Sequence, residues 1–188
     1  TPLPIEELKW ARKNIRSSLS KWKTLYPEII YSTKRIEKKE YQWTHGKYTL
    51  ADIKRYGGIC VDQAYYTIMT ARAFGIPAVY LRGRGRNAGE MHAWCGYMLS
   101  PGKWNLTVGR YESMNFVTGE AQDPQSNATI SDHILDFKCS KTVSGATTIK
   151  SRRLCQLASF YKLQQQEKSY LSSASLAIKT QPLNIDAW

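Results

Sequence analysis

One cysteine and one histidine have surroundings that suit nucleophilic catalysis. Cys60 follows Gly57 and Gly58 at the predicted start of a helix, where unpaired backbone amides and the helix dipole stabilise a thiolate. The glycines allow a sharp turn and the close approach of a substrate. His92 lies in the strand-like run Met91-His92-Ala93-Trp94. A histidine on a strand beside a helix start is the geometry that a Cys–His pair requires.

The segment before this pair is predicted to contain a long amphipathic helix over residues 5–26, which Pro27 ends. Its apolar positions recur at steps of mainly three and four residues: Leu8, Ile15, Leu19, Trp22 and Tyr26. Residues 32–48 are polar and charged, and we expect them to be irregular.

Two further helices are expected to hold the cysteine in place. Thr49, with an acid three residues on, marks the start of a short helix that residues 57–58 close. The helix that carries the cysteine is predicted over residues 59–73, with Gly75 and Pro77 just beyond its end.

The second half of the catalytic region is predicted to be a sheet. Strands are expected at residues 78–81, 91–99, 104–108 and 116–117. The turn sequence at residues 100–103 makes the second and third of these a hairpin. Helices followed by antiparallel strands predict an α+β fold with its helices on one side of the sheet.

The run GGIC–VDQAYYTIMTARAFGIPAVYL…MHAWCGYM resembles the core of bacterial transglutaminase-like domains over roughly residues 48–125. The resemblance implies a papain-like α+β core, to which the periodicity of the flanking segments adds an N-terminal helix and a C-terminal helical hairpin. It also implies that Cys60 is the nucleophile and His92 the general base. The activities implied are those of a cysteine peptidase, an amidase or a protein-glutamine acyltransferase.

The third member of the implied triad departs from the family pattern. An Asp is expected a few residues after Trp104, to orient the histidine ring. The strand reads Trp104-Asn105-Leu106-Thr107-Val108 and holds no carboxylate. Asn105 is the first candidate for this role, Thr107 the second and Asp123 the third. The backbone amide of Cys60 is the natural first oxyanion donor, and the second is open among Gln42, Trp43 and Tyr56.

The C-terminal segment has a helical pattern of its own. Leu154, Leu157, Ala158 and Tyr161 share one face, and Tyr170, Ala174 and Ala177 share another, before Pro182. These spacings resemble one tetratricopeptide repeat, and Trp188 stands 34 residues after Leu154, where a next repeat would begin. The alternative is a plain helical hairpin. The expected division is residues 1–48 for the N-terminal part, 49–140 for the core and 141–188 for the helical tail.

The formal charge of +12 comes from scattered Lys and Arg residues and matches no nucleic-acid motif. The basic run 82–86 is either an anion site or a solvated loop. No apolar run is long enough to span a membrane, and the first residues, Thr1-Pro2-Leu3-Pro4, lack the apolar stretch of a signal peptide. We therefore expect a soluble protein, or a secreted or cell-envelope fragment of a longer one.

The remaining cysteines and histidines form no metal motif, so no metal or cofactor is predicted. Cys95, three residues after His92, is expected to point to the opposite face of its strand and to pack there. A Cys139–Cys155 bridge is conceivable, although nothing local supports it.

Two functions remain open at this point. In the first, Cys60 attacks an amide or peptide carbonyl and forms a thioester, which is released to water or to an amine. In the second, a catalytically impaired domain binds a protein or peptide, with the C-terminal helices as a partner site. The missing carboxylate favours the second function, and the intact GGIC and His-Ala-Trp runs favour the first.

Overall fold

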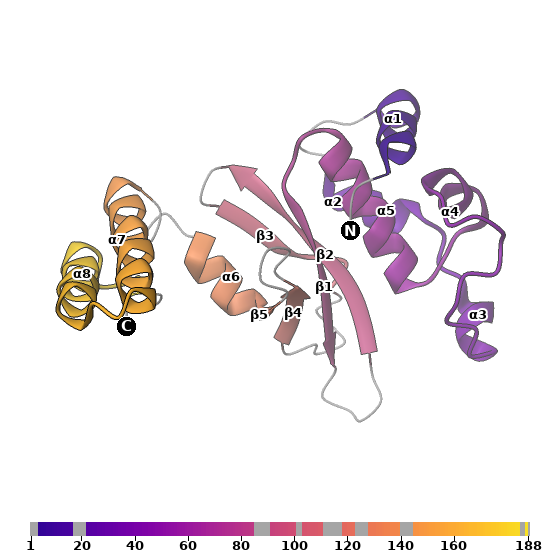
Figure 1. Ribbon diagram of the computed structural model, residues 1–188. Coiled ribbons are helices and arrows are strands. Elements are labelled where there is room, and N and C mark those ends of the chain that lie inside the picture. Colours follow the sequence, from indigo (N-terminus) through magenta and orange to yellow (C-terminus); the bar gives the residue numbers. More distant parts are fainter. Residues whose placement is uncertain are drawn as a thin grey trace. The chain divides into compact units, whose positions relative to one another are not determined.

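The computed structural model describes residues 4–16, 22–84, 91–100, 103–110, 118–122, 128–139, 145–184 and 187. Their backbone divides into two compact units, residues 1–100 with 104–135, and residues 101–103 with 136–188. The first unit contains the cysteine and the histidine, and Figure 1 shows its elements.

A sheet with strand order β3-β2-β1-β4-β5 forms one layer of the first unit. Strand β1 is antiparallel to both β2 and β4, and β4 is antiparallel to β5. The strands are β1 (Ala78–Arg84), β2 (Met91–Ser100), β3 (Lys103–Val108), β4 (Thr118–Gln122) and β5 (Thr129–Ser131). With the helices described below, this arrangement confirms the predicted α+β class. The strand predicted at residues 116–117 lies outside the described residues.

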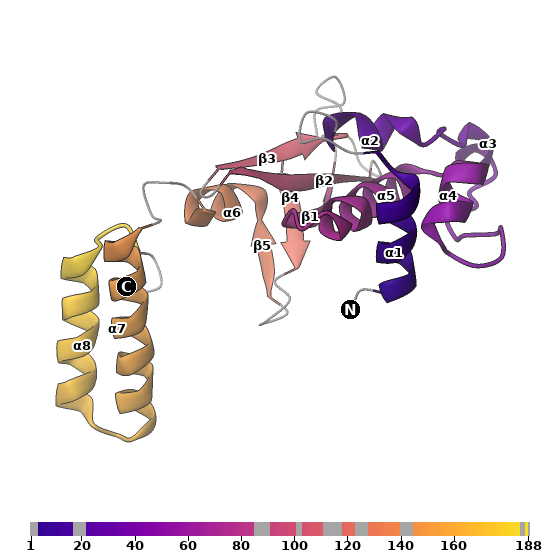
Figure 2. The same cartoon turned by 90° about the horizontal axis from the view of Figure 1, so that it is seen from above.

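Helix α5 (Cys60–Ala73) is the central helix of this unit. Figures 1 and 2 show it against β1 and β2, with α1 and α4 on its other side, and it also packs against α2. Because it is enclosed on both sides, most of its residues are buried, including polar ones such as Asp62, Gln63 and Thr67. A helix in this position is held rigidly by its neighbours.

The N-terminal region differs from the single helix predicted over residues 5–26. It forms α1 (Ile5–Asn14) and α2 (Trp22–Glu28), and Ile15 already has extended backbone angles. The serines of Ser17-Ser18-Leu19-Ser20 are weak helix formers, because their hydroxyls compete for backbone hydrogen bonds. Pro27 lies inside the last turn of α2, so the helix does not stop before it as predicted.

Two short helices precede α5. The region expected to be irregular contains α3 (Thr33–Glu37). Helix α4 (Leu50–Tyr56) begins and ends as predicted, since the Thr49 side chain accepts a hydrogen bond from the Asp52 amide and Gly57 follows the last turn with φ 76°. Helix α6 (Asp132–Cys139) follows β5.

The second unit contains the predicted helical hairpin, α7 (Ala146–Leu163) and α8 (Glu167–Thr180). Ser151 joins the two helices through the Ala177 carbonyl, and Asn184 donates to the Ser151 hydroxyl. Cys155 takes part in no disulfide, so the conceivable bridge to Cys139 is not formed. Trp188 lies outside the described residues. Within the described part of the chain, no helix has both the length and the apolar character that crossing a bilayer requires.

Candidate active site

The two glycines before Cys60 fix how the chain enters α5. Gly57 has φ 76°, and a Cβ on it would collide with the Ile30 carbonyl. A Cβ on Gly58 would collide with the side chain of Asp62. The Gly58 amide donates to the Ile30 carbonyl at 2.9 Å, and its own carbonyl accepts from Ser32 at 2.9 Å. The groups that require these glycines are therefore parts of the protein itself, whereas the sequence suggested an approaching substrate.

The buried carboxylate of Asp62 holds the first turn of α5 in place through hydrogen bonds. Its Oδ2 accepts from the Ile59 amide at 2.8 Å and from Arg35 Nη1 at 2.7 Å, and its Oδ1 accepts from the Tyr48 hydroxyl at 3.0 Å. The Arg35 and Asp62 side chains are 5% and 2% exposed, so the ion pair is buried. The turn that carries Cys60 is therefore fixed by charge-assisted hydrogen bonds.

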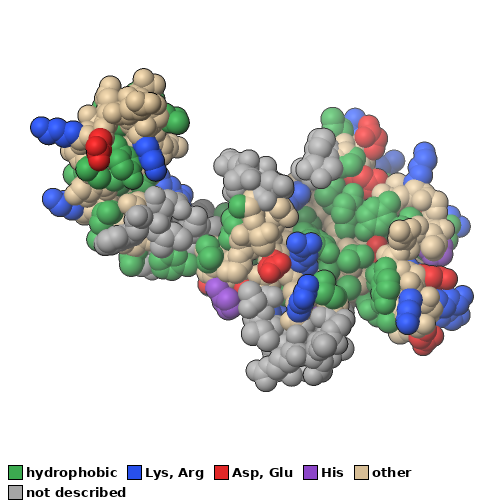
Figure 3. Space-filling view, turned by 60° about the horizontal axis from the view of Figure 1, so that its bottom comes forward, with side chains coloured by type: hydrophobic (Ala, Val, Ile, Leu, Met, Phe, Trp, Pro, Cys, Tyr) green, Lys and Arg blue, Asp and Glu red, His purple; other side chains and the backbone are tan. Residues whose placement is uncertain are grey.

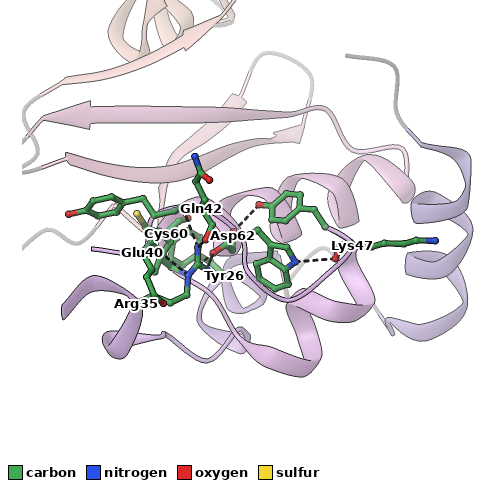
Figure 4. Close-up of polar contacts among 11 residues, drawn as sticks. Tyr26, Arg35, Glu40, Gln42, Lys47, Cys60 and Asp62 are labelled. Atoms are coloured by element: carbon green, nitrogen blue, oxygen red, sulfur yellow. Dashed lines mark hydrogen bonds and ion pairs between the residues drawn. The ribbon is translucent and has the colours of Figure 1, made fainter. Parts of the chain in front are cut away.

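Arg35 also holds the segment that leads toward α4 (Figure 4). It donates to the backbone carbonyls of Glu40, Tyr41 and Gln42 at 3.1, 3.2 and 2.8 Å. One guanidinium thus joins residues 40–42 to the start of α5. Sequence reasoning missed this pair, since an Arg and an Asp 27 residues apart carry no local signal.

Cys60 is the first residue of α5 and is partly exposed. Backbone amides of Ala93, Val61 and Cys60 itself face the sulfur and lower the pKa of the thiol, but burial has the larger effect and raises it. The helix start therefore stabilises a thiolate as predicted, yet it does not outweigh desolvation. At neutral pH the resting group is a thiol that needs a base.

His92 lies on β2, next to the Ala93 amide that faces the Cys60 sulfur. Its Nε2 is 2.6 Å from the carbonyl oxygen of Gly109. A carbonyl can only accept, so Nε2 carries the proton, and Nδ1 of the neutral ring carries none. Burial lowers the pKa of His92. The ring is therefore neutral at pH 7 and able to accept a proton.

Tyr26 of α2 connects the start of α5 with the histidine strand. Its buried hydroxyl donates to the Ala93 carbonyl at 2.7 Å and lies 3.4 Å from the Cys60 carbonyl. Its ring lies edge-on to His92, with centroids 6.5 Å apart. It also packs against Gly109, where a Cβ would stand only 2.5 Å from the ring. This one side chain therefore lies against the backbone of Cys60, Ala93 and Gly109 and against the ring of His92.

The predicted third residues lie elsewhere. Asn105 Oδ1 accepts from the Thr107 amide and hydroxyl, each at 3.0 Å. Asn105 lies beside Gly96 of β2, four residues from His92, which is about 13 Å along a strand. Its side chain is therefore not at the ring, and the Thr107 hydroxyl is engaged with it. Asp123 lies outside the described residues.

A buried acid that sequence reasoning did not single out lies near the histidine. Asp132 is 3% exposed and accepts from Arg110 at 2.8 Å. The Arg110 guanidinium lies 5.1 Å from the centre of the Trp94 ring, and that ring stacks on His92 at 5.9 Å. The Asp132 carboxylate is therefore linked to the imidazole through the Arg110 guanidinium and the Trp94 ring.

The oxyanion donors are partly defined. The first-turn amides of α5 lack partners one turn back, which supports the Cys60 amide as the first donor. Of the side-chain candidates, Trp43 donates to the Lys47 carbonyl at 3.1 Å, and Tyr56 stacks on His45. Figure 4 shows the Gln42 carboxamide directed toward the sheet, as is the Cys60 thiol. Gln42 is therefore the candidate that the view favours.

Cys95 is buried and packs as predicted, with its sulfur 3.6 Å from the Val108 carbonyl. Among the described residues there is no group of three or more His, Cys, Asp or Glu that could hold a metal ion.

A helix that begins at a cysteine and packs on an antiparallel sheet whose strand β2 carries a histidine is the arrangement of a papain-like α+β fold. The model of the transglutaminase-like superfamily matches residues 9–106, just over half of the 188-residue chain. The chain belongs to this superfamily.

A structural comparison finds a candidate cysteine protease from Cytophaga hutchinsonii, with 22% sequence identity and a TM-score of 0.38. The match covers 54% of this chain and 36% of that chain. No match to this chain was found among curated proteins.

Proposed function

We propose that this protein is a cysteine hydrolase or acyl transferase that acts on peptide or amide bonds through a thioester at Cys60. The observation that supports this most directly is the placement of the Cys60 sulfur beside the Ala93 amide, next to a histidine whose far nitrogen is fixed by Gly109. Family membership agrees with this chemistry.

The reaction begins with proton transfer from the Cys60 thiol to Nδ1 of His92, as the sulfur attacks the carbonyl carbon. The oxyanion of the tetrahedral intermediate is stabilised by the Cys60 amide and, in this proposal, by Gln42. Collapse breaks the C–N bond, and the His92 imidazolium returns its proton to the leaving amine. Water or a second amine then attacks the thioester and releases Cys60.

The Gly109 carbonyl takes the orienting role for which Asn105, Thr107 and Asp123 were the alternative candidates. It fixes the tautomer, as the family's carboxylate would. Being uncharged, it stabilises the imidazolium less than a carboxylate does. We therefore expect a slower enzyme than one with a full Cys–His–Asp triad.

The test uses the whole chain with fluorescently labelled casein, in the presence and absence of a labelled primary amine. Release of small fragments reports hydrolysis, and labelled casein reports transfer. Both signals should require Cys60 and His92, so Cys60→Ser and His92→Ala should abolish them. Equal signals from the wild type and Cys60→Ser would reject the proposal. Saturable casein binding without turnover would favour the alternative function, a peptide-binding module.

We also propose that the C-terminal hairpin is one tetratricopeptide-like repeat that stacks on a helical neighbour. Large apolar side chains are exposed on it, namely Ile149 at 53%, Phe160 at 53%, Leu163 at 80% and Leu171 at 56%. Isolated repeats need neighbours to cover such faces. A consensus repeat fused after residue 184 should raise the Tm of this unit, whereas an unrelated fused domain should not. Equal Tm values for the two fusions would reject the repeat assignment.

A further inference from the structure

The face of β1 that adjoins the start of α5 carries two arginines. Residues two apart on a strand share a face, so Tyr80, Arg82 and Arg84 lie together. In the register with β2, Tyr80 is opposite Cys95 and Arg82 is opposite Ala93. Cys95 interacts with Thr67 of α5, which identifies this face as the one that α5 covers.

Cys60 lies at the same level of this face as Arg82. The amide that faces its sulfur belongs to Ala93, the direct cross-strand partner of Arg82, and such partners have Cα atoms about 5 Å apart. Tyr80 interacts electrostatically with both Cys60 and Arg82. Two residues further along β1, Arg84 lies opposite Met91. The two arginines therefore border the approach to the nucleophile.

Both arginines are open to solvent and only partly neutralised. The Arg82 side chain is 57% exposed, and its Nε lies 3.9 Å from Glu120 on β4, a long contact. Arg84 is exposed, as is its neighbour Met91 at 60%. Asp62, the acid closest to Cys60 in the chain, is already paired with the buried Arg35. The charge that this face presents beside the thiol is positive.

This local arrangement matters more than the total charge. On the face shown in Figure 3, Lys and Arg side chains lie in several separate groups and form no continuous stripe of the kind that tracks a nucleic-acid backbone. The run that sequence analysis left open between an anion site and a solvated loop is, at residues 82 and 84, part of a regular strand beside the nucleophile.

We propose that Arg82 and Arg84 bind the carboxylate of an acidic residue next to the scissile amide, so that the preferred substrates are acidic peptides. This inference rests on the proposed function, because it assigns a role relative to Cys60. A substrate side chain one residue from the attacked carbonyl lies several ångströms from the sulfur, within the reach of a long arginine. Guanidinium groups favour carboxylates through paired hydrogen bonds.

The test uses affinity reagents that need no turnover. N-chloroacetyl-glutamate amide and N-chloroacetyl-glutamine amide carry the same reactive carbon and differ only in the charge of the side chain. Mass spectrometry follows the alkylation of Cys60, with the partly exposed Cys155 as an internal reference. The glutamate reagent should react with Cys60 about fivefold faster than the glutamine reagent. The ratio at Cys155 should be near one, and 1 M salt should suppress the preference at Cys60.

Variants locate the origin of the preference. Arg82→Gln and Arg84→Gln should each lower the Cys60 ratio, and Glu120→Gln should raise it by freeing Arg82. Arg153→Gln, which removes an exposed charge from α7, is the matched control and should leave the ratio unchanged. A ratio near one in the wild type, or one unaffected by either arginine variant, overturns the inference.

The outcome separates the two proposals. If casein turnover requires Cys60 but the glutamate and glutamine reagents alkylate Cys60 at nearly equal rates, the proposed enzyme activity is supported and the acidic preference is rejected. A ratio that depends on Arg82 and Arg84, without turnover that requires Cys60, supports the acidic preference as a binding property and rejects the enzyme.

Discussion

The imidazole of His92 donates its Nε2 proton to the carbonyl oxygen of Gly109 at 2.6 Å. Most centres of this kind place a side-chain oxygen there. In this protein a backbone group fixes the tautomer, and Gly109 reaches its position because its α-carbon packs flat against the Tyr26 ring.

Gly109→Ala tests this relationship. Gly109 has φ 82°, and an added methyl group would stand 2.5–2.7 Å from Tyr26 ring atoms. We expect a loss of about 1–2 kcal/mol from the backbone conformation and a further 1–3 kcal/mol from the steric clash. The His92-dependent alkylation of Cys60 should fall at least tenfold, because the carbonyl must move.

Gly75→Ala is the matched control for this change. Its φ is 75°, and a Cβ there would meet nothing within 4 Å. It should show only the backbone cost, as measured by urea unfolding, and normal labelling of Cys60. Similar effects of the two variants would show that contact with Tyr26 is unimportant.

Tyr26→Phe tests whether the hydroxyl holds the helix start and the histidine strand together. Removing it deletes the 2.7 Å hydrogen bond to the Ala93 carbonyl. We expect about 1 kcal/mol of destabilisation and slower alkylation of Cys60, measured by mass spectrometry under native conditions.

The control is Tyr66→Phe. The Tyr66 hydroxyl is buried and, within the described part of the chain, has no hydrogen-bond partner. Its removal should be neutral or slightly stabilising. If Tyr26→Phe is also neutral, the hydrogen bond from Tyr26 to Ala93 contributes neither to stability nor to the alkylation of Cys60.

The pH dependence of Cys60 alkylation follows from two opposite shifts. Burial lowers the pKa of His92, so the ring stays neutral, and able to act as a base, down to a pH below its usual 6.5. Burial raises the pKa of Cys60 above its usual 9.0, so a thiolate without a base forms only at still higher pH. The rate with iodoacetamide should therefore rise in two steps, one below pH 6.5 and one above pH 9.0.

His92→Ala should remove the lower step and leave the upper one. A single step near pH 4 in the wild type, as a preformed thiolate–imidazolium pair gives, would contradict the neutral resting state.

The Arg35–Asp62 pair should be costly to break from either side. Asp62→Asn leaves a buried guanidinium uncompensated, and we expect about 3–5 kcal/mol of destabilisation in urea unfolding. Arg35→Met combined with Asp62→Asn should cost less than the sum of the single changes. The exposed pair of Lys54 and Glu28, at 2.8 Å, is the reference, and Lys54→Met should cost at most about 1 kcal/mol. Equal losses in the free energy of unfolding for Asp62→Asn and Lys54→Met would show that the buried ion pair is no more important for stability than the exposed one.

Features governed by short-range signals could be predicted from the sequence. Thr49 and Gly57 bound α4, Gly75 follows α5, and the strands around His92 lie where the apolar patterns place them. The end of α1 at Asn14 was not predicted, because the apolar periodicity of the sequence continues to Tyr26.

The candidate site was less accessible from sequence, because its supporting contacts join distant segments. Tyr26 is 67 residues from Ala93, and Arg35 is 27 residues from Asp62. The acceptor for His92 is the backbone carbonyl of Gly109, and a pattern of side-chain types in the sequence cannot reveal a backbone contact. Asn105 was ranked first from its position after Trp104, but the strand register places it beside Gly96.

The orienting atom of this centre cannot gain a proton. An aspartate in its place would begin to lose its charge near pH 4, and the hold on the imidazole would weaken with it. The peptide oxygen of Gly109 is the same acceptor at pH 3 as at pH 8. Of these two hydrogen-bonded groups, acidification therefore changes only the histidine. The ring stays aligned by Gly109 even after it has been protonated and can no longer act as a base.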